Sequence, residues 1–122
     1  MQSSDVVTLH IHLDKENINF FNKEKFALLK RNAILLNSSR GGVLDEDALL
    51  AALESGQIAA AGLDVLANEL GNLKENKLIQ YAKLHDNLLI TPHCGGAAID
   101  AQQSTFKEII TRIVNFLNSR EV

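Results

Sequence analysis

The sequence has one cysteine, one proline and no tryptophan among its 122 residues. Because Cys94 has no second cysteine to pair with, the chain cannot form an intrachain disulfide or a cluster of thiolate metal ligands, and a reducing compartment is the simpler interpretation. Apolar runs stay below the ~20 residues that a membrane-spanning helix needs, and the first residues lack the basic and apolar pattern of a signal peptide. We therefore expect a soluble, cytoplasmic protein.

An excess of charge of one sign is also absent, since 12 basic residues stand against 15 acidic ones for a net charge of −3. Such a balance creates no large positive field, so neither nucleic acid nor a membrane surface is an expected partner. The seven glycines nowhere form the pattern G-x-G, which at first argues against dinucleotide binding. A length of 122 residues with 46% hydrophobic content is typical of one globular domain.

Apolar runs of strand length alternate with segments of helical periodicity, a pattern typical of parallel β/α units. Asn22 and Asp45 are placed as helix N-caps, and Gly56 as the residue that ends a helix. Because Ala33–Asn37 is continuously apolar, we expect that strand to be covered on both faces. The predicted fold is α/β with about four parallel strands, over 6–11, 33–37, 58–65 and 88–91, and with helices over 20–29, 45–55, 75–84 and 99–117, the last of them amphipathic.

Charged residues follow three of the predicted strands at their carboxyl ends. Arg40 follows the second strand, Asp64 ends the third with Glu69 five residues later, and His93 follows the fourth. In open α/β sheets the ligand crevice lies at this edge. An arginine can hold a carboxylate with two hydrogen bonds, and a histidine beside a carboxylate is a poised proton carrier. The pattern therefore predicts acid/base chemistry on an anionic substrate.

Each of these four residues also has a plainer interpretation. Arg40 could be a solvated loop arginine, and Asp64 could cap a turn at the end of its strand. Glu69 could be a surface carboxylate, and His93 could be a packed loop histidine. Their placement at equivalent strand ends favours a common site.

Other candidates carry less weight. His10 and His12 alternate along the first strand and could hold a metal, but no third ligand is indicated. Gly41-Gly42 and Gly95-Gly96 could let the backbone approach a ligand, although tight turns are the default explanation for such pairs. Cys94 beside His93 does not form a nucleophile and base pair, because adjacent residues in an extended chain point to opposite sides.

Four motifs follow one another along the chain, and they are D-V-V-T-L-H from Asp5, N-S-S-R-G-G-V-L-D-E-D-A-L from Asn37, S-G-Q-I-A-A-A-G-L-D-V from Ser55 and L-L-I-T-P-H-C-G-G-A from Leu88. Together they resemble the D-isomer-specific 2-hydroxyacid dehydrogenases, a family that includes D-lactate, glycerate, phosphoglycerate and formate dehydrogenases. The resemblance implies half of a Rossmann-type doubly wound sheet and a reaction in which a hydride passes between NAD or NADP and a D-2-hydroxy acid or its 2-oxo acid.

The resemblance also implies a role for each matching residue. Arg40 matches the arginine that binds the substrate carboxylate and carbonyl, His93 the histidine that exchanges a proton with the substrate oxygen, and Glu69 the carboxylate paired with that histidine. Asp64 matches the aspartate that orients the nicotinamide carboxamide. The other positions expected at the cofactor are Ser39, His10, Gly95 and Gly96.

The sequence departs from the family pattern in three respects. His12 and Leu70 stand where the family usually has proline. The family's G-x-G-x-x-G turn, its ribose-binding acidic residue and its substrate domain would all precede Met1. We therefore expect residues 1–122 to be the C-terminal portion of the NAD-binding domain, inactive in isolation. A homodimer is possible, because the family is typically dimeric and the first strand would have a free edge.

A different class of function stays open, namely an interaction module, because the same fold serves transcriptional corepressors that keep the catalytic residues. The sequence does not identify the 2-hydroxy acid, and it does not decide between NAD and NADP.

Overall fold

The computed structural model describes residues 1–118, which fall into two units. The first unit comprises residues 1–92, and the second begins at His93. Each unit is described by itself below.

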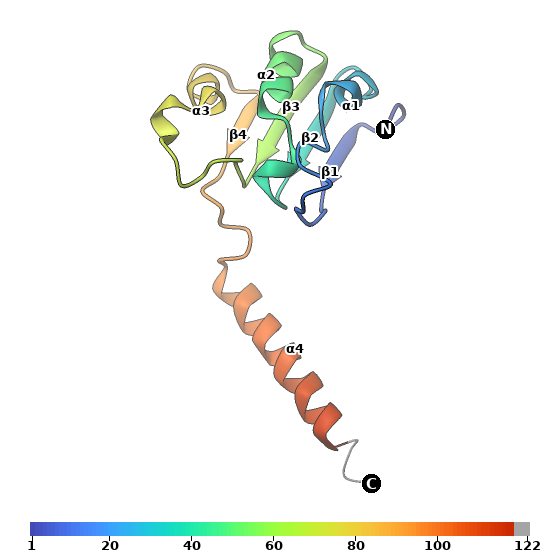
Figure 1. Ribbon diagram of the computed structural model, residues 1–122, viewed down its shortest axis with the longest axis vertical. Coiled ribbons are helices and arrows are strands. Elements are labelled where there is room, and N and C mark those ends of the chain that lie inside the picture. The colour runs from blue at the N-terminus through green and yellow to red at the C-terminus, as the bar shows by residue number, and fades with distance from the viewer. Residues whose placement is uncertain (119–122) are drawn as a thin grey trace. The chain divides into compact units, whose positions relative to one another are not determined.

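The first unit is built on a parallel sheet in which every strand pairs with the strand before it in the chain, in the order β1-β2-β3-β4 (Figure 1). This arrangement confirms the predicted α/β fold with four parallel strands. The strands are β1 (Val6–Leu9), β2 (Ala33–Asn37), β3 (Ile58–Leu63) and β4 (Leu88–Ile90), and the helices are α1 (Lys23–Ala27), α2 (Glu46–Glu54) and α3 (Lys77–Ala82), with short 3-10 helices η1 (Gly41–Val43) and η2 (Leu73–Glu75).

Polar side chains start all three helices of this unit. The side chains of Asn22, Asp45 and Asn76 accept hydrogen bonds from backbone N–H groups in the first turns of α1, α2 and α3. Gly56 follows α2 with a φ of 68°, a left-handed conformation that glycine adopts without steric cost. The predicted caps at Asn22 and Asp45 and the helix end at Gly56 are confirmed.

The core lies between the helices and one face of the sheet. Leu35 and Leu63 point into it from the strands, and Phe26, Leu49 and Leu78 cover them from α1, α2 and α3. Alternate residues along the strands face the other way, as the pleat requires, and they are exposed. These exposed residues are Val6, Thr8, Ile34, Leu36 and Leu89.

The expectation that Ala33–Asn37 is covered on both faces is therefore wrong for the described residues. Ile34 is 38% exposed and Leu36 is 40% exposed, whereas their neighbours along β2 are buried. The physical reason is the strand order. The connections between successive parallel strands are right-handed, and here each connection leads to the next strand in the same direction along the sheet. All of the connecting helices therefore lie on one face. The opposite face of residues 1–92 stays open.

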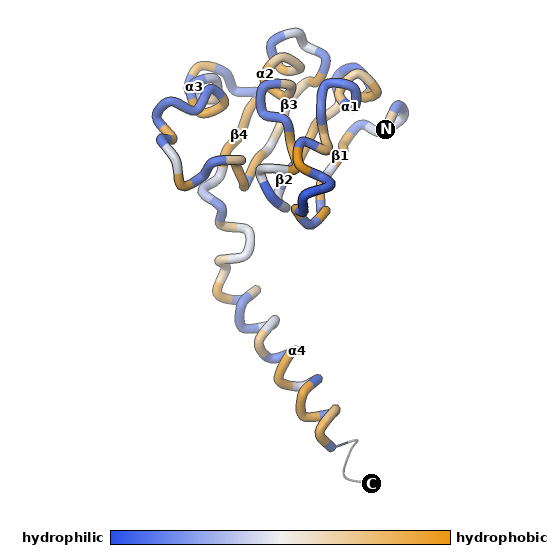
Figure 2. The backbone as a smooth tube through the Cα atoms, viewed as in Figure 1, coloured by the Kyte–Doolittle hydropathy of each residue, from blue (hydrophilic) through white to orange (hydrophobic). Residues whose placement is uncertain are grey.

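The second unit contains α4 (Ile99–Asn118), which confirms the helix predicted over 99–117. Its hydropathy alternates from turn to turn, as Figure 2 shows. Among the described residues, no helix combines the length and the apolar character that crossing a bilayer requires. The apolar residues recur at the spacing of one helix face, at Ile99, Phe106, Ile109, Ile110, Ile113, Val114 and Leu117.

Candidate functional site

A groove of about 380 Å³ runs along the carboxyl ends of all four strands in the first unit. Its walls are largely apolar, with Leu36, Gly62 and Leu89 on the open face of the sheet. A Cβ atom at residue 62 would stand 2.9 Å from Leu36 Cδ2, so glycine leaves this wall clear. The polar residues of the lining are Thr8, His10, Asn37, Ser38, Asp64 and Thr91.

Asn37 is buried at the end of β2 and organises the turn that carries Arg40. Its Oδ1 accepts hydrogen bonds from Ser39 N at 3.1 Å and Ser39 Oγ at 2.9 Å, and its Nδ2 donates to the Arg40 carbonyl oxygen at 3.1 Å. Since the side chain is only 1% exposed, these bonds replace its contacts with water. No role was predicted for Asn37 from the sequence, although its position as a polar residue at the end of an apolar strand was a signal.

Arg40 lies on the exposed side of this turn. Its Nη1 donates a hydrogen bond to the Ser39 carbonyl oxygen at 2.6 Å, and the side chain is otherwise open to solvent. A guanidinium held in this way keeps N–H groups directed outward, which suits the binding of a carboxylate.

Gly41 brings the Arg40 turn against the loop that follows β3. A Cβ atom at residue 41 would stand 1.9 Å from the Leu66 carbonyl carbon and 2.3 Å from Ala67 N. Contact between two chain segments therefore requires this glycine. The close approach to Leu66 and Ala67 accounts for glycine at position 41, and the approach of a ligand to this glycine stays a prediction.

The loop after β3 carries the two carboxylates predicted from the sequence, both half-buried. Asp64 is fixed between its neighbouring strands, because its N–H donates to the Asn37 carbonyl oxygen at 2.9 Å and its Oδ1 accepts from Thr91 Oγ1. Glu69 folds back over the loop, and its Oε1 accepts from Leu66 N at 2.9 Å. The loop thus holds both carboxylates in defined positions.

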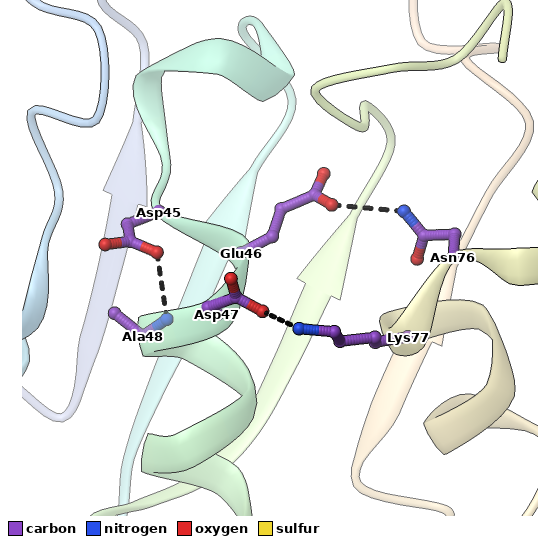
Figure 3. A network of polar contacts seen from close by, with 6 residues as sticks. All are labelled: Asp45, Glu46, Asp47, Ala48, Asn76 and Lys77. Carbon is purple, nitrogen blue, oxygen red and sulfur yellow. Dashed lines mark hydrogen bonds and ion pairs between the residues drawn. The ribbon is translucent and has the colours of Figure 1, made fainter.

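Polar contacts join the start of α2 to this loop and, as Figure 3 shows, to Asn76 and Lys77 at the start of α3. Glu46 Oε1 accepts from Ala67 N at 2.6 Å, and its Oε2 accepts from Asn76 Nδ2 at 3.1 Å. Asp47 accepts from Lys77 Nζ at 2.7 Å. This hydrogen bond, and then the attraction between the two charges, raises the pKa of Lys77 above its ordinary 10.5. Glu46 also lay outside the sequence-based prediction.

His93 opens the second unit, together with Gly95 and Gly96. Its φ of 52° is left-handed, a conformation uncommon for a residue with a side chain and often found at functional sites. The extended chain that we assumed for His93 and Cys94 is therefore not present at His93. Nothing lies within 4 Å of a Cβ placed on Gly96, so local packing does not require glycine there.

The predicted site residues are thus divided between the two units. His10 and Asp64 line the groove, Ser39 and Arg40 follow its lining residue Ser38, and Glu69 lies on the loop that touches Gly41. His10 Nε2 lies 2.9 Å from Thr8 Oγ1. Among residues 1–118, no three histidine, cysteine or acidic side chains are placed to hold a metal ion.

Known proteins match this chain over nearly its whole length. The sequence model described as "D-isomer specific 2-hydroxyacid dehydrogenase, NAD binding domain" matches residues 1–95. The chain is 38% identical over 117 residues to "D-3-phosphoglycerate dehydrogenase 2, chloroplastic" from Arabidopsis thaliana, covering 96% of the chain and 18% of that protein. It is also 38% identical over 117 residues to "Glycerate dehydrogenase" from Methylorubrum extorquens, covering 96% of the chain and 36% of that protein.

Solved structures share the fold. The structure of "a Novel D-lactate Dehydrogenase from Sporolactobacillus sp" aligns with a TM-score of 0.79 at 35% identity, over 95% of the chain and 37% of the other chain. The predicted Rossmann-type architecture is confirmed, and the family predicted from the four motifs is confirmed by the match over residues 1–95. The chain spans well under half the length of each of these proteins.

Proposed function

Because the chain belongs to the D-isomer-specific 2-hydroxyacid dehydrogenases, matching their NAD-binding domain, we propose that it serves hydride transfer between NAD(H) and a D-2-hydroxy acid or its 2-oxo acid. The observation that carries the proposal is the meeting of a groove, a fixed aspartate and an exposed arginine at the carboxyl ends of β2 and β3. This edge is where open α/β sheets bind ligands.

The groove fits the nicotinamide end of the cofactor. Apolar walls at Leu36, Gly62 and Leu89 suit the faces of a flat ring, and Asp64 at the polar side can accept hydrogen bonds from a carboxamide. Thr91 donates to Asp64 and so orients that carboxylate. When bound, the nicotinamide supplies or accepts the hydride. Ser39 and His10 lie beside the same edge and complete the proposed cofactor contacts in this unit.

Arg40 is proposed to hold the substrate carboxylate. The turn that carries Arg40 is fixed by Asn37 on one side and by the contact of Gly41 with Leu66 on the other, so the guanidinium presents its N–H groups from a rigid base. A guanidinium can meet a carboxylate with two parallel hydrogen bonds, which fixes the orientation of the reacting carbon as well as its position.

His93 is proposed to carry the proton and Glu69 to favour its charged form. In the direction of reduction, His93 would give its proton to the carbonyl oxygen of the 2-oxo acid. In the direction of oxidation, it would take the proton of the hydroxyl group. A carboxylate that is paired with a histidine stabilises the imidazolium form of that histidine. The position of His93 three residues after Ile90, the last residue of β4, supports this assignment, with Gly95 and Gly96 following as proposed cofactor contacts.

Binding and turnover test the proposal separately. Titrating the ¹⁵N-labelled chain with NADH should shift the amide resonances of Thr8, Ser38, Asp64 and Thr91, and Asp64→Asn should weaken the effect. In the protein isolated from its natural source, NADH should be oxidised when 2-oxo acids are added, and His93→Ala should lower the rate about 100-fold or more. Shifts confined to other residues, or turnover unaffected by His93→Ala, would contradict the proposal.

We further propose that the protein is cytoplasmic and forms a homodimer. The low cysteine content, one residue in 122, supports the first assignment, and the open edge of β1 within residues 1–92 supports the second. Native mass spectrometry of the protein from its source tests the dimer. A 13.4 kDa chain bound to an unrelated protein, with no turnover, would support an interaction module instead.

A further inference from the structure

We propose that Glu46 is a positioning residue that fixes the loop carrying Glu69, and that the reaction depends on it although it touches neither substrate nor cofactor. The inference rests on the proposed function for its catalytic consequence. That Glu46 fixes the backbone between Asp64 and Glu69 can be tested without measuring turnover.

Two carboxylates hold two successive amides of this loop. Glu69 accepts from Leu66 N at 2.9 Å, and Glu46 accepts from Ala67 N at 2.6 Å. Hydrogen bonds to a charged acceptor are roughly twice as strong as those between neutral groups. Because the bond between Leu66 and Glu69 lies within the loop, that bond cannot anchor the loop to the rest of the fold. Glu46 supplies such an anchor from α2.

The loop is held from two directions by neighbouring parts of the chain. Gly41 in η1 lies against the backbone of Leu66 and Ala67, and Glu46 in the first turn of α2 bonds to Ala67 N. Only four residues separate Gly41 from Glu46, so η1 and the start of α2 form one support. The same support follows Arg40 directly, and it therefore sets the Glu69 loop relative to the Arg40 turn.

Both oxygens of Glu46 accept hydrogen bonds, so position 46 requires a carboxylate. Asn76 caps α3 by accepting from Ile79 N through its Oδ1 at 3.1 Å, which leaves Nδ2 directed at Glu46 Oε2 at 3.1 Å. Position 46 must therefore accept from both Ala67 and Asn76. Glutamine has one oxygen and one amino group, so it would face either Ala67 N or Asn76 Nδ2 with a donor.

An exchange of chemical groups tests this requirement. In Glu46→Gln the amide of Ala67 or of Asn76 loses its acceptor, and in Asn76→Asp two carboxylates face one another. In the double variant, the new amino group at position 46 can donate to the new carboxylate at position 76, which can still cap α3. The remaining side-chain oxygen at position 46 can still accept from Ala67 N. If Glu46 contributed only to overall stability, the effects of Glu46→Gln and Asn76→Asp would add. If Glu46 has the proposed role, the second substitution should reverse the effect of the first.

The matched control is Asp47→Asn. Asp47 also joins the start of α2 to the start of α3, but it does so through Lys77, and both side chains are exposed. Asp47→Asn therefore removes the ion pair between α2 and α3 without removing an acceptor from Ala67.

Amide hydrogen exchange in the full chain is the primary measurement. Glu46→Gln should speed exchange at Leu66 and Ala67 by about tenfold, because Ala67 N and Asn76 Nδ2 then compete for the single side-chain oxygen of glutamine. The double variant should restore slow exchange, and Asp47→Asn should leave it unchanged. Unchanged exchange in Glu46→Gln, equal acceleration in Asp47→Asn, or no recovery in the double variant would overturn the proposal.

Turnover in the protein from its natural source provides the second measurement. Glu46→Gln should lower kcat by about tenfold while the KM for NADH changes less than about threefold, and the double variant should recover kcat. If exchange follows the expected pattern but NADH leaves the groove residues unshifted, the proposed function fails while the dependence of the loop on Glu46 stands. If NADH binds but Glu46→Gln leaves kcat unchanged, the catalytic role of Glu46 is refuted and the proposed function stands.

Discussion

Gly41 lies against Leu66 so closely that a Cβ atom at residue 41 would stand 1.9 Å from the Leu66 carbonyl carbon. This contact joins the turn after β2 to the loop after β3, and the two segments carry Arg40 and Glu69. Backbone atoms cannot move aside as the end of a flexible side chain can. Replacing one Hα atom of Gly41 with a methyl group would therefore change the spacing of these two segments.

We predict that Gly41→Ala lowers the free energy of unfolding by about 3 kcal/mol, because the added methyl group forces the two backbones apart. Urea unfolding of the chain measures the change. Gly42→Ala is the matched control, since the atoms nearest to its Cβ would belong to the Leu13 side chain, the first at 3.0 Å, and the leucine can adjust. Equal losses in the two variants would contradict the role given to Gly41.

Asn37→Ala should lower the free energy of unfolding by about 2 kcal/mol, because it leaves Ser39 N and the Arg40 carbonyl oxygen without their side-chain partner. Ser38→Ala, at an exposed neighbouring position, should change it by less than about 0.5 kcal/mol. Both values come from denaturant unfolding. If the two variants behave alike, Asn37 does not organise the Arg40 turn.

Thr91→Val should weaken NADH binding several-fold, because the valine methyl cannot donate to Asp64 and the carboxylate loses its orientation. Fluorescence titration with NADH measures the affinity. Thr91→Ser keeps the hydroxyl and should retain most of the binding. Loss of affinity in the serine variant equal to that in the valine variant would show that the methyl group of Thr91 matters and the hydrogen bond does not.

Stability at high pH should depend on Asp47 and Lys77. The pKa of Lys77 is raised in the folded chain, first by its hydrogen bond to Asp47, so the pair stabilises the fold from neutral pH up to the ordinary value of 10.5. That contribution disappears as the pH rises through the raised pKa. Asp47→Asn should return the pKa of Lys77 toward 10.5, as measured by NMR titration of the lysine side chain. A pKa that Asp47→Asn leaves unchanged would contradict the assigned cause.

Features that depend on neighbouring residues could be predicted from the sequence. Asn22 and Asp45 cap helices through bonds that reach only three residues along the chain. Gly56 ends α2 by its own conformation. The charged residues Arg40 and Asp64 could be placed because each closely follows a recognisable strand.

Features that depend on distant residues could not be predicted. Glu46 accepts hydrogen bonds from Ala67 and Asn76, which lie 21 and 30 positions away in the chain. The residues next to Glu46 in the sequence do not indicate these partners. The apolar run Ala33–Asn37 predicted a buried strand, but it did not show whether helices cover one face of the sheet or both. Its open face became evident only from the positions of α1, α2 and α3.

The strand order within residues 1–92 also has a consequence for biosynthesis. Each strand pairs with the strand made immediately before it, so no segment has to wait for a partner that is translated much later. The closing of each new loop is limited to one β-α unit, which keeps the entropic cost of each pairing small. A nascent chain that has emerged as far as β3 already contains all the partners that β1 and β2 have within this sheet, and the ribosome can deliver β4 to an edge that is already formed.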